Sequence, residues 1–132
     1  MNTIINPPEL SPPIGFSHAI SSTNATTVFL AGQVSADQGG KIIHVGDLVK
    51  QFDQTLRNLQ VVMALAGGAM TDITKLTLFV RSKADYKNNL RAVGKIYQTY
   101  FGKYFPAMTL VEVSSLFEDD ALIEIEGIAT LS

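Results

Sequence analysis

Two stretches decide the fold of this chain: Tyr104-Phe-Pro-Ala-Met-Thr-Leu-Val-Glu-Val113 and Leu122-Ile-Glu-Ile-Glu-Gly-Ile-Ala129. In the first, Pro106 breaks the chain before a run rich in apolar and β-branched residues. In the second, apolar residues alternate with glutamates. Both patterns predict β-strands close to the C-terminus. Because the two strands carry carboxylates inside an apolar pattern, they also point to a candidate site.

Three glutamates lie on these predicted strands. Alternation along a strand places Glu124 and Glu126 on one face, and it places Glu112 on the face of Met108 and Leu110. A carboxylate among apolar neighbours can serve as an acid or a base. The competing interpretation, which the residue pattern alone favours, is that these glutamates pair with Lys or Arg or meet solvent at a sheet edge.

Length and composition indicate one globular domain, residues 1–132, with 46% apolar and 17% charged residues. A net charge of −2 gives no electrostatic reason to expect a nucleic-acid partner. The absence of cysteine excludes disulfides, thiolate metal ligands and cysteine nucleophiles. The first residues lack the basic start and long apolar run of a signal peptide, and no segment is apolar for long enough to span a bilayer. We therefore expect a cytoplasmic protein with no membrane partner.

Periodicity predicts six strands and two helices. The predicted strands cover residues 16–20, 27–34, 42–45, 73–80, 107–113 and 121–131. The first helix follows the N-cap candidate Asp47 and ends before Gly67, and the second ends at Gly102. One mixed sheet with both helices on one face is the simplest way to bury both helices, which predicts an α+β fold. The other face of the sheet is semi-apolar, so we expect a partner subunit to cover it.

Charged residues are unevenly distributed. No Lys or Arg follows Lys103, so a group that binds an anion beside the last two strands must come from another segment, another subunit or backbone N–H groups. Four basic residues at intervals of four form a stripe on the second predicted helix: Lys83, Lys87, Arg91 and Lys95. We interpret this stripe as a solvated helix face rather than an RNA-binding surface, because no aromatic residue interleaves it.

Five pieces of the sequence, in order, resemble the RidA/YjgF-type reactive intermediate deaminase family. Phe16-Ser-His-Ala19 is similar to Tyr-Ser-Gln-Ala of that family, and Ala31-Gly-Gln-Val34 is similar to Ser-Gly-Gln-Ile. Asp72-Ile-Thr-Lys-Leu-Thr-Leu-Phe-Val80 resembles Asp-Ile-Val-Lys-Thr-Thr-Val-Phe-Val. The Tyr104–Val113 run, with its Phe105-Pro-Ala and Val-Glu-Val segments, and the Leu122–Ala129 run complete the resemblance, which covers nearly the whole chain.

The resemblance implies a chorismate-mutase-like subunit that assembles as a homotrimer, with the sheets forming a central barrel and the helices outside. Small molecules would bind in clefts between subunits. Enzymes of the family hydrolyse enamines and imines released by pyridoxal-phosphate enzymes to a 2-oxo acid and ammonia. In them an arginine after Pro-Ala holds the substrate carboxylate. A glutamate equivalent to Glu124 helps to orient the attacking water, which makes Glu124 the candidate catalytic residue.

At five site positions this chain departs from the family pattern. Met108 stands in place of the arginine, Phe16 of a tyrosine and Ala31 of a serine. Gly94 stands where an asparagine is common, and Leu110 where a cysteine is common. Each change removes a polar group, so we expect the cleft to prefer a larger and less charged ligand than a small imino acid.

The candidate substrate-binding residues combine these five positions with three more: Phe16, Ser17, Ala31, Gly32, Gly94, Met108, Thr109 and Leu110. Two functions remain open. The protein binds or deaminates an enamine or imine with an altered preference, or it is a non-catalytic binding or structural trimer. The histidines, His18 and His44, have no partners at metal-ligand spacing, so we expect neither a metal nor a cofactor. His18 has a polar role near the cleft or, more simply, lies at a strand edge.

Overall fold

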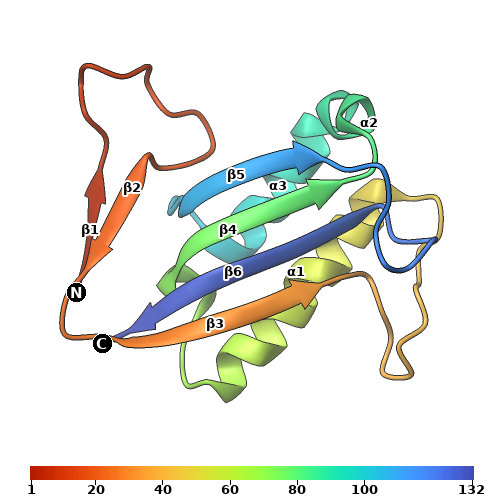
Figure 1. The fold of residues 1–132 in the computed structure, drawn as a ribbon, viewed down its shortest axis with the longest axis horizontal. Helices are drawn as coiled ribbons and strands as arrows, with labels where there is room; N and C mark the ends of the chain where they lie inside the picture. The colour runs from red at the N-terminus through yellow and green to blue at the C-terminus, as the bar shows by residue number, and fades with distance from the viewer.

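The computed structural model describes all residues 1–132 and is built around a four-stranded mixed sheet (Figure 1). The strands are β3 (Thr26–Gln33), β4 (Ile73–Val80), β5 (Ala107–Glu112) and β6 (Ile123–Leu131). Their order across the sheet is β3-β6-β4-β5, with β4 and β5 parallel and the other pairs antiparallel. The two C-terminal stretches are therefore strands, as predicted. β6 is central and β5 lies at an edge.

Three helices pack on one face of this sheet (Figure 1): α1 (Leu48–Leu65), α2 (Lys83–Asn88) and α3 (Leu90–Phe101). α1 begins where predicted, because the side chain of Asp47 accepts a hydrogen bond of 3.0 Å from the backbone N–H of Lys50. Beyond its C-terminal end, Gly67 has a φ of +88°, which glycine adopts without steric cost. The predicted α+β class, with the helices on one face, is confirmed.

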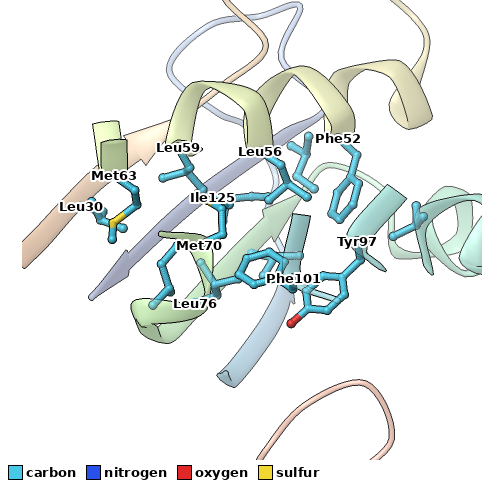
Figure 2. Packing of buried hydrophobic residues seen from close by; sticks show 14 of the residues in the cluster. Leu30, Phe52, Leu56, Leu59, Met63, Met70, Leu76, Tyr97, Phe101 and Ile125 are labelled. Atoms are coloured by element: carbon cyan, nitrogen blue, oxygen red, sulfur yellow. The ribbon is translucent and has the colours of Figure 1, made fainter. Parts of the chain in front are cut away.

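The hydrophobic core fills the space between the sheet and helices α1 and α3 (Figure 2). The cluster includes Phe52 and Leu56 of α1, Leu76 of β4 and Ile125 of β6, and each of these side chains is 1% exposed or less. Alternate strand residues point to the opposite face, where no helix of this chain lies (Figure 1). Phe29 is 78% exposed there. The sheet therefore has one fully packed face and one open face.

The N-terminal region differs from the prediction. β1 (Asn2–Ile5) pairs with β2 (Ala19–Ser22) in a separate two-stranded sheet, which stands apart from the main sheet in Figure 1. The strand predicted at residues 16–20 is thus displaced towards the C-terminus and joins another sheet. A four-residue strand such as β1 is too short to give a periodic signal, so its partner could not be identified from sequence.

Two other predictions are wrong. Residues 42–45 form no strand: only Ile42 makes an isolated bridge, to Ala36, and His44 then turns the chain with a φ of 60°. The predicted second helix is divided at Asn89, whose side-chain amide donates to the backbone oxygen and Oδ1 of Asp85. Asparagine commonly bonds to nearby backbone groups in this way instead of continuing a helix. The basic stripe is therefore split between α2 and α3.

None of the three helices combines the length and the apolar character required to cross a membrane.

Candidate functional site

A cavity of about 810 Å³ opens between α3, the helix-facing side of β5 and the chain segment that precedes β2. Fourteen of its nineteen lining residues are hydrophobic, and none is Asp, Glu or His. Its size and lining are those of a small-molecule pocket. A ligand in this cavity would be held mainly by apolar contact, and the lining residues of this chain offer it no carboxylate or imidazole as a base.

The β5 wall of the cavity contains Met108 and Leu110. These residues alternate along the edge strand and pair with Leu76 and Leu78 of β4, so both point towards the helices. Both are half-buried, whereas their β4 partners are at most 2% exposed. Because the outer side of β5 pairs with no strand and has only the isolated bridge between Ser17 and Ala107, the cavity can open past these two side chains.

Phe16 reaches the cavity because Ser17 fixes the N-terminal segment to the chain beside β5. The backbone N–H of Ser17 donates to the carbonyl of Pro106 at 3.0 Å, and its hydroxyl donates to the carbonyl of Phe105 at 2.6 Å. Ser17 is 4% exposed. Both of its donors are therefore used within the chain, and the structure gives it the role of anchoring Phe16 instead of contacting a ligand.

The α3 wall contains Gly94 and Tyr97. A Cβ atom added to Gly94 would have nothing within 4 Å, so this position leaves space that a larger residue would fill. Tyr97 stacks on Phe101 and Phe105, with ring centroids 4.4 and 5.4 Å away, and its hydroxyl donates to the carbonyl of Tyr104. Burial raises the pKa of Tyr97, so this side chain stays neutral and acts as an aromatic wall.

Glu124 lies on the opposite, open face of the sheet. Its neighbours in β6, Ile123 and Ile125, are fully buried under the helices, so Glu124 points the other way. Its carboxylate lies over Gly32, where an added Cβ would come within 2.0 Å of Oε2. The register between β3 and β6 shifts between Leu30 and Gln33. Ala31 and Gly32 therefore belong to a bulge beside the glutamate, a common arrangement near functional sites.

Thr109 also lies on the open face, where its hydroxyl accepts a hydrogen bond of 2.8 Å from Nζ of Lys75. The predicted site residues thus form two groups. Phe16, Gly94, Met108 and Leu110 line the cavity, whereas Ala31, Gly32, Thr109 and Glu124 lie across the sheet from it. Within one chain the sheet separates the candidate base from the apolar pocket.

The other polar candidates have structural partners. The backbone N–H of His18 donates to Oδ1 of Asn6, and its ring Nε2 lies 2.8 Å from the carbonyl oxygen of Ser11. The imidazole edge also packs on Phe16, with centroids 5.2 Å apart. His18 therefore stabilises the N-terminal segment behind the cavity. No group of three or more His, Cys, Asp or Glu side chains is placed to hold a metal ion.

Sequence reasoning missed two polar residues that line the cavity, Gln98 and Lys103. Gln98 was missed because the helical periodicity predicts that the apolar side of this helix, which includes Tyr97, packs only against the core. It does not predict that the neighbouring Gln98 lines a cavity. Lys103 follows Gly102, the residue that ends α3 with a φ of 63°. The sequence could have indicated Lys103, because this lysine lies between Gly102, where the second helix was predicted to end, and the Tyr104–Val113 stretch.

The family model described as Endoribonuclease L-PSP matches residues 8–131. The chain belongs to this family. A solved structure of a Rid family protein of unknown function, YyfB of Yersinia pestis, superimposes with a TM-score of 0.86 at 35% identity and covers 98% of both chains. The RidA/YjgF resemblance seen in the sequence is thereby confirmed for the whole fold.

Two relatives in this family are named as deaminases. The 3-aminoacrylate deaminase RutC of Acinetobacter baylyi is 32% identical over 122 residues, which cover 92% of this chain and 93% of the relative. The 2-iminobutanoate/2-iminopropanoate deaminase of Dermatophagoides farinae is 30% identical over 129 residues, covering 97% and 95%. The L-PSP family of this chain thus contains proteins named for deamination of small enamine and imine acids.

Proposed function

We propose that this protein hydrolyses an enamine or imine to a 2-oxo compound and ammonia, in sites formed between the subunits of a homotrimer. One observation carries the proposal: no carboxylate or imidazole lines the apolar cavity, while the half-buried Glu124 lies on the open sheet face. A second copy of the chain can bring its open face to the mouth of the cavity and so join the two halves. The names of the two deaminase relatives support the reaction class.

In the proposed reaction, water adds to the carbon of the C=N bond. Glu124 accepts a proton from the attacking water and passes it to the nitrogen, which gives a carbinolamine. Glu124 then takes the hydroxyl proton of this intermediate and returns it to the nitrogen as the C=O bond forms and the C–N bond breaks. The imine and one water molecule give the carbonyl product and ammonia, so no oxidant or cofactor is needed. The apolar cavity would hold the body of the substrate and keep other water molecules away from the reacting carbon.

Met108 should alter the substrate preference. A thioether donates no hydrogen bond, so a three-carbon imino acid loses the paired contacts that an arginine gives to its carboxylate. Losing a charge-assisted hydrogen bond costs about 1.5–3 kcal/mol, or roughly one to two powers of ten in affinity or rate. We therefore expect slow deamination of 2-aminoacrylate and 2-iminopropanoate by the native protein.

The test is a coupled assay of imine decay with the native protein and three variants. Met108→Arg should raise kcat/KM for small imino acids by roughly tenfold or more. Adding Glu124→Ala should abolish that gain, because the proposed base is gone. Glu126→Gln is the matched control: it lies two residues away on the same face and should leave turnover unchanged.

Two outcomes would contradict parts of the proposal. Native turnover of small imino acids equal to that of an arginine-bearing relative would refute the role given to Met108. Turnover that survives Glu124→Ala would refute the role given to the glutamate. The alternative of a non-catalytic binding trimer is favoured by the same lack of carboxylate and imidazole side chains in the cavity. It would be supported if neither the native protein nor Met108→Arg turned over any imine.

A further inference from the structure

We infer that the cavity selects molecules with a bulky apolar body, aromatic or long-chain, that carry a single carboxylate held by the ammonium group of Lys103. For turnover, this inference rests on the proposed function and names its substrate class: imines of large, apolar amino acids, which hydrolysis would convert to the corresponding 2-oxo acids. For binding, it depends only on the cavity and can be tested without catalysis.

The size of the cavity is the first argument. A three-carbon imino acid would fill only about a fifth of the 810 Å³, if each non-hydrogen atom takes roughly the 30 Å³ of a liquid water molecule. The remaining space is bounded by Phe16, Tyr97 and Phe105 and is widened at Gly94, which has no side chain. An aromatic or long alkyl group would displace water from these surfaces, which is the main source of affinity in an apolar pocket.

The charge at the cavity is the second argument. Lys103 is the one charged residue that lines it. The chain makes a single ion pair, between Arg57 and Asp53, so the ammonium group of Lys103 has no carboxylate partner. No Asp or Glu occurs between Tyr86 and Val111, the segment that supplies most of the lining. An anionic group on the ligand would therefore meet no competing carboxylate from this segment.

The backbone around Lys103 is held in place, which is the third argument. The carbonyl of Tyr104 accepts a hydrogen bond of 3.0 Å from the hydroxyl of Tyr97, and the hydroxyl of Tyr104 donates to the carbonyl of Ile73. The next carbonyl, of Phe105, accepts from Ser17. Lys103 itself is exposed, whereas Tyr104 and Phe105 are half-buried. A cation on a fixed backbone loses less entropy when it binds an anion than one on a mobile loop.

A single lysine suits a carboxylate better than a doubly charged phosphate. The cavity offers one compact positive charge and the neutral amide of Gln98, with no arginine for paired contacts. The position of the charge also differs from that of the family arginine, which corresponds to Met108 on β5. The anionic end of the ligand would thus lie near the end of α3, and its apolar body would extend past Met108 towards Gly94.

Binding is measured by calorimetry on the full-length protein with three probes: 4-phenylbutanoate, propanoate and 4-phenylbutanamide. We expect 4-phenylbutanoate to bind roughly ten- to a hundredfold more tightly than propanoate, because of the additional apolar area that it buries. We expect the neutral amide to bind roughly three- to tenfold more weakly than the acid. Equal affinity for the two acids, or for the acid and the amide, would overturn the inference.

Three variants test which residues contact the carboxylate and the apolar body of the ligand. Lys103→Ala should remove the difference between acid and amide, while Lys95→Ala, an exposed lysine that does not line the cavity, should preserve it. Gly94→Leu should weaken 4-phenylbutanoate by about tenfold and leave propanoate nearly unchanged, because the new side chain occupies the empty space. Selectivity that survives Lys103→Ala, or unchanged 4-phenylbutanoate binding by Gly94→Leu, would place the ligand elsewhere.

The outcomes separate this inference from the proposed function. Probe binding as expected without turnover of any imine would refute the deaminase proposal and leave the ligand class intact. Turnover of small imino acids without selective binding of 4-phenylbutanoate would refute the ligand class and leave the deaminase proposal intact.

Discussion

Replacing Gly94 by alanine should stabilise the protein. Glycine in the interior of a helix costs about 0.8–1.0 kcal/mol relative to alanine, because the unfolded chain loses more freedom when glycine is fixed. Gly94 lies in the middle of α3 and is not among the residues with positive φ. An added Cβ has no atom within 4 Å, so no steric clash offsets the gain.

The expected net effect of Gly94→Ala is about 1 kcal/mol of additional free energy of unfolding. For a domain of this size, that raises Tm by roughly 3–5 °C. The measurement is urea and thermal unfolding followed by circular dichroism, at one fixed protein concentration because any assembly makes stability depend on concentration. The slope of the free energy of unfolding against urea concentration should be the same in Gly94→Ala as in the native protein.

A matched control is Gly127→Ala. Gly127 is buried in β6, and its Cβ would lie 2.7 Å from the backbone oxygen of Lys75, so this variant should lose about 1–3 kcal/mol. A loss of stability in Gly94→Ala would show that the space beside α3 is filled in solution, and it would refute the description of the cavity. A gain in both variants would refute the packing of β6 against β4.

Further predictions concern assembly, nucleic acid and pH. Light scattering after size exclusion should give a homotrimer of the 14.3 kDa chain, and a monomer at micromolar concentration would contradict the proposed site. Highly purified protein should not cleave RNA at physiological salt, and cleavage that vanished in Glu124→Ala would overturn this expectation. Burial raises the pKa of Tyr104 from 10 to about 12. The contribution of Tyr104 to the free energy of unfolding should therefore be constant below about pH 10 and lost between about pH 10 and 12, because the unfolded chain ionises first. Over that range the free energy of unfolding should fall less steeply in Tyr104→Phe than in the native protein.

The main sheet could be predicted from sequence because its strands have two faces of different composition. β4 and β6 alternate buried and open residues, and that alternation is visible in the glutamates at 124 and 126. The break at Asn89 and the separate β1–β2 sheet could not be predicted in the same way. A single asparagine bonding to Asp85 and a four-residue strand depend on contacts that leave no periodic pattern.

The sequence predicted which residues belong to the candidate site, but not how they are arranged in space. Alternation fixes which residues share a face of one strand, but it cannot say which face the helices cover. The structure puts Met108 under the helices and Glu124 on the open side, so the two residues cannot meet within one chain. Lys103 was not predicted as a site residue because it lies in a loop. In a loop, the spacing of residues along the sequence does not indicate which side chains lie close together in space.

The way in which the N-terminal sheet is attached affects how the cavity can change in evolution. Residues 1–22 join the rest of the chain at few points: Ser17 bridges Ala107 and bonds to Phe105, and Oδ1 of Asn2 accepts from the hydroxyl of Thr130. The same segment contributes Ile14, Gly15 and Phe16 to the cavity. Ile14 is 89% exposed and supports nothing in the core. Substitutions or length changes in this segment could reshape one wall at little cost to folding, whereas the β5 and α3 walls are tied to the core. New ligand preferences would therefore arise most readily from changes at residues 14–16 and in the segment that places them.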